Sequence, residues 1–114
     1  MSRKLDAAIA EALGYALKIY QEIECIHWRE DDGTPQLAGL PHYSTDGDAM
    51  LDLDEEMRAR GCSLYVLRDI KGYVVMYWSR EKDGYLCGRG EADTMPLAVA
   101  LAAYKALTGK EWVE

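Results

Sequence analysis

The chain has 114 residues, of which 49% are hydrophobic and 29% are charged, and these values fit one folded domain better than a disordered segment. Its formal net charge is −7, with 13 basic and 20 acidic residues. This balance disfavours duplex nucleic acid as a partner, because the phosphate backbone attracts basic surfaces. No apolar run approaches the roughly 20 residues that span a bilayer. Residues 1–6 predict neither a secretory nor a mitochondrial signal.

Apolar residues at helical spacing predict a first helix over residues 3–13, which Gly14 ends. Residues 15–29 fit both the alternation of strands and a helical period. We favour two strands there, because Ile, Tyr and Trp are common in strands, and the helix stays open as the alternative. Residues 30–35 contain Asp-Gly and Pro and predict a turn, with a loop following it through residue 42.

A second helix is expected over residues 46–60, with Ser44 or Thr45 as its N-terminal cap and Gly61 at its end. Acidic residues fill its early turns and arginines its last turn, which is the arrangement that the helix dipole favours. The stripe that we expect to be buried consists of Met50, Leu53 and Met57.

An antiparallel meander is predicted next, with turns at Lys71-Gly72 and Asp83-Gly84. The middle strand is apolar on both faces, which predicts that helical layers cover it on both sides. Glycines in the last strand indicate a bulge or a close approach of another backbone. The three strands are expected over residues 63–70, 73–79 and 85–91, and the two glycines are Gly88 and Gly90.

A third helix is expected to begin after Thr94, with Pro96 in its first turn, and to end at Gly109. A stripe of larger apolar residues and a second face of small residues give it a broad apolar surface. This surface predicts deep burial or a subunit interface, and we expect a homo-oligomer, most simply a dimer. The elements together predict an α+β domain, a three-layer α/β/α sandwich with a mostly antiparallel sheet.

A short N-terminal motif and two segments that open helices stand out: Leu5-Asp6-Ala7, Pro41-His42-Tyr43-Ser44-Thr45-Asp46 and Glu91-Ala92-Asp93-Thr94-Met95-Pro96-Leu97-Ala98. Together they resemble the bacteriophage "ABA sandwich" domain family, a group of uncharacterised phage and prophage proteins. The resemblance covers most of the chain, and residues 15–40 match least well. It implies a layered α/β/α fold, a phage or prophage source and therefore the host bacterial cytoplasm, with no catalytic residues to carry over.

Catalytic and metal-binding patterns find little support in the sequence. No local signature frames His27 or His42 as part of a nucleophilic site. Cys25 and His27 would supply two zinc ligands, whereas a zinc site needs more. We expect no enzyme activity, no required metal and no cofactor, and a hydrolase with an unrecognised Cys or His is the least favoured alternative. The three thiols, Cys25, Cys62 and Cys87, are expected to be free, because no secretion signal precedes them.

The candidate ligand-binding residues lie mainly where two of the expected helices begin. Ser44-Thr45-Asp46 would present hydroxyls and a carboxylate at a pocket rim, although a plain helix cap is the favoured interpretation. Gly88-Arg89-Gly90, close to Thr94, would cradle a phosphate, although a twisted strand is favoured there. If both helix starts open on one edge of the sheet, a ligand fits between them. With a strand tryptophan added, the candidate ligand-binding residues are Ser44, Thr45, Asp46, Trp78, Arg89 and Thr94.

The acidic excess is local, because six of the 20 acidic residues lie between positions 46 and 56. Such a face attracts a basic macromolecule, and it also serves simply to keep a protein in solution. We therefore expect a non-enzymatic accessory protein that acts by binding, against host defence, through a basic host protein or a small signalling nucleotide. A structural, self-assembling protein is the main alternative. The expected partner surface consists of Asp52, Asp54, Glu55 and Glu56.

Overall fold

The computed structural model describes residues 3–20, 23–29, 35–81 and 84–113, and within residues 16–38 it describes the backbone only. Helices and strands alternate in blocks along the chain. The elements are α1 (Arg3–Ala12), β1 (Ala16–Tyr20), β2 (Ile23–Arg29), β3 (Pro35–Gly39), α2 (Gly47–Ala59), β4 (Cys62–Asp69), β5 (Gly72–Ser79), β6 (Leu86–Ala92) and α3 (Met95–Thr108). The α+β class expected from the sequence is confirmed.

The strands form two separate antiparallel sheets, in the orders β1-β2-β3 and β4-β5-β6. The two strands favoured over residues 15–29 are confirmed, and the helical alternative is wrong. The loop predicted before residue 42 is partly wrong, because β3 pairs with β2 from Pro35 onward. A proline is tolerated at the first residue of a strand, and the partner strand fixes this extended backbone despite its weak strand propensity.

The meander predicted from the alternating pattern is confirmed, and its strand ends agree within about one residue. Gly72 opens β5 with φ of 138°, which a side chain rarely tolerates, so a glycine is needed at this turn. A bulge between Tyr77 and Trp78 shifts the register with β6. Asp83, in the second predicted turn, lies outside the described residues.

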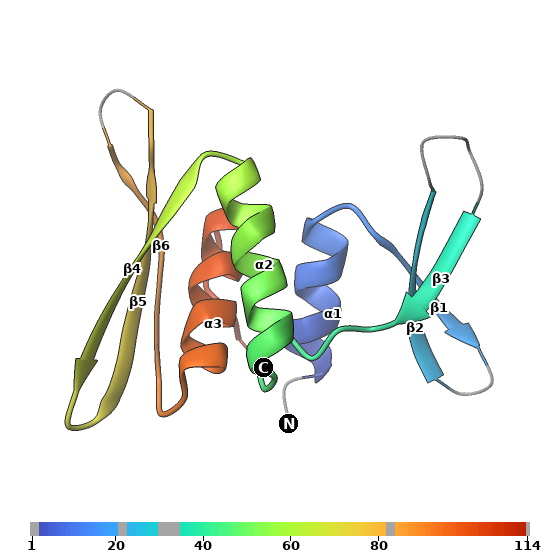
Figure 1. Ribbon diagram of the computed structural model, residues 1–114, viewed down its shortest axis with the longest axis horizontal. Coiled ribbons are helices and arrows are strands. Elements are labelled where there is room, and N and C mark those ends of the chain that lie inside the picture. The colour runs from blue at the N-terminus through green and yellow to red at the C-terminus, as the bar shows by residue number, and fades with distance from the viewer. Residues whose placement is uncertain (1–2, 21–22, 30–34, 82–83, 114) are drawn as a thin grey trace.

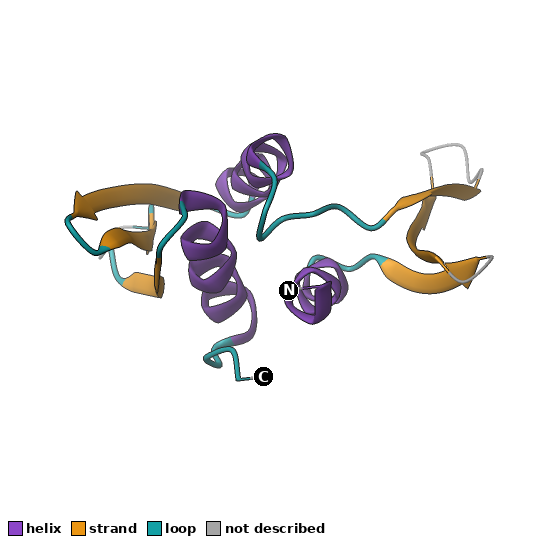
Figure 2. Ribbon diagram, turned by 90° about the horizontal axis from the view of Figure 1, so that it is seen from below, coloured by secondary structure: helices purple, strands orange, loops and turns teal. Residues whose placement is uncertain are grey.

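The helices lie between the two sheets, as Figure 1 and Figure 2 show. Helix α3 packs on β5 and β6, α2 contacts the start of β4, and α1 and α2 both pack on α3. All contacts of the helices with the β4–β6 sheet fall on one of its faces, and no described element covers the opposite face. The three-layer sandwich is therefore not confirmed.

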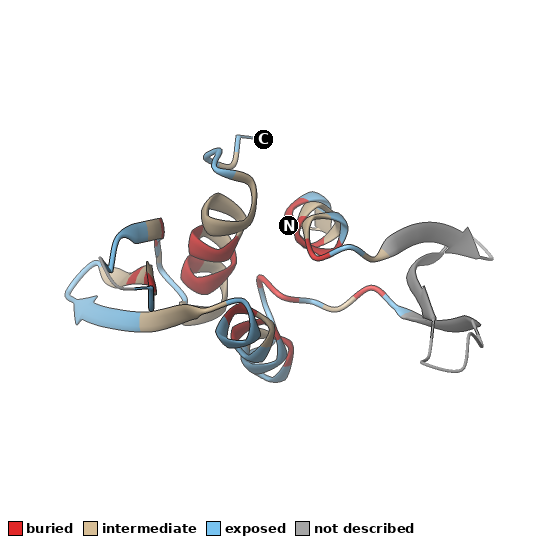
Figure 3. Cartoon of the chain, turned by 90° about the horizontal axis from the view of Figure 1, so that it is seen from above, coloured by how far each residue is buried: buried red, intermediate tan, exposed pale blue. Residues whose placement is uncertain are grey.

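A core of alanines and larger apolar side chains joins the three helices to β5. Five residues of α3 are buried: Ala98, Val99, Ala100, Ala102 and Ala103. They meet Leu5, Ile9, Leu53, Met57, Val75 and Tyr77. Figure 3 shows the burial concentrated on α3 and on the inner sides of its neighbours. Much of the apolar surface of α3 is thus used inside the chain, while its larger residues Leu97, Leu101, Tyr104 and Leu107 are only partly buried against this core.

Helix α3 approaches β6 closely because β6 carries glycines at the points of contact. A Cβ atom added at Gly88 would lie 2.1 Å from the backbone oxygen of Ala102, and one at Gly90 would lie 2.4 Å from that of Ala98. Neither distance is sterically tolerable, so both positions require glycine. The close approach and the bulge predicted for this strand are both confirmed.

No helix among the described residues is long and apolar enough to cross a membrane.

Candidate functional site

The loop before α2 is held by a buried carboxylate on α1. Asp6 is fully buried and accepts a hydrogen bond from the Ser44 amide at 2.9 Å. The Arg3 guanidinium pairs with Asp6 at 2.8 Å and donates to the backbone oxygens of Leu40 and Pro41. One ion pair thus fixes both ends of the loop that leads to Ser44. The Leu5-Asp6-Ala7 motif supplies this carboxylate.

The cap of α2 is Asp46, and the prediction that Ser44 or Thr45 caps this helix is wrong. The Asp46 side chain accepts a hydrogen bond from the amide of Ala49 at 3.1 Å. The preceding residues form a turn closed by the bond from the Asp46 amide to the His42 oxygen, which places the cap later than expected. The Ser44 hydroxyl is buried and has no hydrogen-bond partner among the described residues.

Helix α3 begins at Met95, as predicted, and Thr94 is its N-terminal cap residue. The Thr94 side chain makes no capping hydrogen bond, and Pro96 follows in the first turn. The first amides of a helix lack intrahelical partners and carry a partial positive charge. These donors and the Thr94 hydroxyl are available to a ligand.

A cavity of about 610 Å³, the helix-start cavity, lies between the N-terminal ends of α2 and α3. Such a volume is in the range of small-molecule sites. It brings together three of the predicted binding residues, Ser44, Thr45 and Thr94, and Asp46 follows directly as the α2 cap. The lining is completed by Glu91, Ala92, Asp93, Pro96 and Leu97.

Two predicted binding residues lie elsewhere. Trp78 and Arg89 belong to the uncovered face of the sheet, in register with Ser63 and Met76 respectively. The strand pleat explains this, because the neighbouring Tyr77, Gly88 and Gly90 face the helices. The phosphate cradle considered at Gly88-Arg89-Gly90 is not formed, since both glycines are occupied by contact with α3. The Arg89 guanidinium instead pairs with the Glu91 carboxylate at 2.9 Å.

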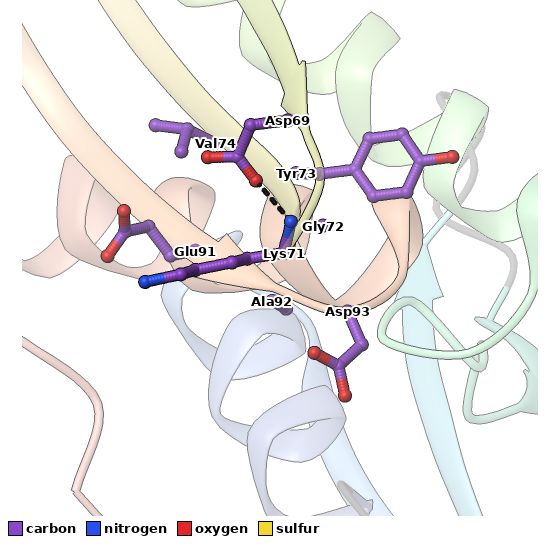
Figure 4. Close-up of a pocket in the computed structure, with 8 residues that line it drawn as sticks. All are labelled: Asp69, Lys71, Gly72, Tyr73, Val74, Glu91, Ala92 and Asp93. Atoms are coloured by element: carbon purple, nitrogen blue, oxygen red, sulfur yellow. Dashed lines mark hydrogen bonds between the residues drawn. The ribbon is translucent and has the colours of Figure 1, made fainter.

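A second cavity, of about 250 Å³, adjoins the same end of the sheet and shares Glu91, Ala92 and Asp93 with the helix-start cavity. Figure 4 shows the Lys71 side chain extending toward the side of Glu91, while Asp93 points away from it. The Lys71 amide donates to Asp69 at 2.7 Å, which shapes the turn. Sequence reasoning treated Lys71 only as a turn residue and gave no signal for this cavity.

An acidic hollow of about 420 Å³ lies over α2, lined by Tyr15, Pro41, Tyr43, Asp52, Glu55, Glu56 and Ala59. It contains three of the four residues expected to form the partner surface. The fourth, Asp54, is only 6% exposed, so its assignment to that surface is wrong. Asp54 accepts a hydrogen bond from the Tyr77 hydroxyl at 3.0 Å and pairs with Arg58 at 3.1 Å. These partners explain how a carboxylate is tolerated inside.

The tyrosines of the acidic hollow hold their protons firmly. Burial raises the pKa of Tyr15, and the hydrogen bond that its hydroxyl donates to Glu56 at 3.1 Å adds to the effect. Burial also raises the pKa of Tyr43, with smaller contributions from the charges of Tyr15 and Glu56. The hollow therefore presents neutral phenols beside carboxylates at neutral pH, a lining that suits a cationic group.

Cys62 is not an activated nucleophile. Cys62 and Cys87 are free and lie close together. The pKa of the Cys62 thiol is raised, mainly by burial and to a smaller extent by the neighbouring Cys87. A catalytic thiol needs a shift in the opposite direction. His42 is exposed, and the side chains of Cys25 and His27 lie outside the described set. Among the side chains that are described, no cluster of three or more His, Cys, Asp or Glu is placed to hold a metal ion.

Comparison of the chain with protein-family models, curated proteins and solved structures finds no match. The resemblance to the phage family therefore stays a prediction from the sequence motifs. The function is therefore inferred from the cavities and the side chains that line them.

Replacing Asp6 with alanine tests how the loop is held. The Asp6→Ala variant leaves the Ser44 amide and the Arg3 guanidinium without their carboxylate, so we expect the free energy of unfolding to fall by about 2–3 kcal/mol. Glu11→Ala, an exposed position at the end of the same helix, is the control and should change it by less than about 0.5 kcal/mol. Urea unfolding measures both, and equal losses would refute the anchoring role.

Proposed function

We propose that this chain is a non-enzymatic binding protein that holds a small ligand, a signalling nucleotide, in the helix-start cavity. The convergence of Ser44, Thr45 and Thr94 between two helix N-termini is the observation that carries the proposal. These residues come from segments about 50 positions apart in the chain, and the packing of α2 and α3 brings them to one cavity.

A nucleotide suits the mixed chemistry of this cavity. The free amides at the start of α3 and the Thr94 hydroxyl are donors for a phosphate oxygen. The carboxylates of Glu91 and Asp93 are acceptors for ribose hydroxyls or a base amino group. Arg89 pairs with Glu91 and so reduces the repulsion that this carboxylate exerts on a phosphate. The apolar wall from Pro96 and Leu97 offers a surface for a base or ribose.

The protein would sequester its ligand without changing it chemically, which fits the state of two candidate catalytic residues. The raised pKa of the Cys62 thiol leaves it protonated at neutral pH, and His42 is exposed in a loop. Neither residue lines the helix-start cavity. The resemblance to phage proteins supports an accessory role in an infected or lysogenic host, in the bacterial cytoplasm and against host defence. We also propose the three-layer sandwich expected from the sequence. Its third layer would cover the apolar face of β5 that no described element covers.

The ligand proposal is tested by calorimetry with a panel of cyclic and linear nucleotides, followed by mass analysis of the released ligand. We expect one nucleotide class to bind and to return chemically unchanged. Thr94→Ala should weaken binding roughly 3- to 10-fold, because one hydrogen bond is lost. The matched control is Thr108→Ala at the far end of α3, where the hydroxyl donates to the Tyr104 oxygen, and it should leave affinity unchanged. Failure of the whole panel to bind, or release of an altered ligand, would contradict the proposal.

A basic host protein is the second candidate ligand, supported by the acidic hollow. Asp52, Glu55 and Glu56 are gathered there beside two protonated tyrosines, and a Lys or Arg side chain fits such a lining. Opposite charges would also accelerate the encounter and make it sensitive to salt.

Charge reversal in the hollow tests this second candidate. A basic protein recovered from host lysate should associate more slowly with the variant carrying Asp52→Lys and Glu55→Lys, since attraction becomes repulsion. Glu81→Lys, an exposed acid away from the hollow, should have a much smaller effect. Asp54 is left unchanged because it is buried. Equal association rates for the two variants in stopped-flow measurements would count against the acidic hollow.

A further inference from the structure

The outer half of β4 is an unpartnered, apolar sheet edge. In the order β4-β5-β6, β4 is hydrogen-bonded to β5 and to no other described strand. Tyr65, Val66 and Leu67 are 56%, 36% and 59% exposed, although they are consecutive residues on alternating faces of the strand. Figure 3 shows this half of the strand extending beyond the helices as an exposed segment. Lysine and proline, which commonly protect such edges, are absent from β4.

We propose that β4 pairs in antiparallel fashion with β4 of a second copy of this chain, about a two-fold axis at Val66, to make one continuous six-stranded sheet. A second copy fits this edge because the strand is complementary to itself. With Val66 at the axis, Tyr65 lies opposite Leu67 of the second copy, and the two share the uncovered face. Exposed apolar side chains then cover one another on that face.

The charges of β4 also fit this register. Arg68 lies opposite Leu64 of the second copy, and Asp69 lies opposite Ser63, so no like charges meet. A two-fold axis at Arg68 or Asp69 would instead place a residue against its own charge, which destabilises a strand pair. A two-fold axis that passes between two residues would pair each residue with one whose side chain lies on the other face of the sheet. Antiparallel strands do not pair in this way. Among the remaining axes, only Val66 sets the two most exposed apolar residues of the strand, Tyr65 and Leu67, opposite each other, and we therefore place the axis there.

This proposal places the interface on β4 instead of α3, because much of the apolar surface of α3 packs within the chain. Pairing through an edge leaves the helix-start cavity and the acidic hollow in place, because neither is lined by β4 residues. A dimer of this kind would carry two copies of each site.

The first test is the mass in solution, measured by light scattering on the full chain. We expect a dimer for the natural sequence and a monomer for Val66→Lys, because two lysines would lie directly opposite each other at the axis. Leu51→Lys on α2, where the leucine is 57% exposed, is the control and should remain dimeric. Circular dichroism of each variant reports whether it is folded. A monomeric natural chain, or a folded dimeric Val66→Lys variant, would overturn the proposal.

The second test concerns the register. Ser63→Lys places a cation opposite Asp69 of the second copy at two symmetry-related points, and the dimer should tighten roughly 2- to 30-fold. Ser63→Asp places like charges at the same points and should loosen the dimer by a similar factor. Analytical ultracentrifugation of the two variants separates this register from any other. Changes of the same sign in both variants would overturn the assignment of Val66 to the axis.

Discussion

The arrangement of the helices on the sheet rests on the close contact between α3 and β6. Gly88 and Gly90 leave the strand without side chains where the helix backbone passes, and the alanines of α3 complete the fit. Dispersion attraction falls quickly with distance, so it stabilises the structure where the two backbones are in contact. Larger side chains would hold the backbones apart and remove this attraction. The contact also places the start of α3 at one end of the β4–β6 sheet, directly after β6.

Two further features bring α2 to the same place. The Arg3–Asp6 ion pair fixes the loop that ends at Ser44, and the bond from Tyr77 to Asp54 ties α2 to the central strand of the sheet. Removing one partner from a buried polar pair costs more than its formation gains, so both contacts restrict how the helices are arranged. The helix-start cavity is the result of these restraints, because its lining residues are spread over the loop before α2, the end of β6 and the start of α3.

The sequence predicted the elements that follow from local patterns. The three helices, the meander of β4–β6 and the role of Gly88 and Gly90 were within reach of periodicity and turn chemistry. Strand β3 was missed because pairing with β2, and not propensity, makes it a strand. The burial of Asp54 was missed because its partner Tyr77 lies 23 positions away in the sequence. The cap position depended on how the loop turns at residues 42–46, which composition does not fix.

In the candidate site, too, local patterns were predictable from the sequence and tertiary contacts were not. Ser44, Thr45 and Thr94 were proposed because helix starts are recognisable, and the convergence of the two starts depended on tertiary packing. The outward position of Trp78 and Arg89 was accessible in principle, since alternation along β5 and β6 puts them on the face away from the glycines. The acidic hollow required Tyr15 and Tyr43 from distant segments, which no spacing in the sequence indicated.

Glycine substitutions in β6 test the close contact between α3 and β6. Gly88→Ala places a Cβ atom against the backbone of α3, and we expect a loss of more than about 2 kcal/mol in the free energy of unfolding. Gly47→Ala at the start of α2 is the matched control, because nothing lies within 4 Å of its added Cβ atom and its stability should be unchanged or slightly higher. Urea titration of the two variants beside the natural chain decides the matter. A Gly88→Ala variant as stable as the control would contradict the close helix–strand contact.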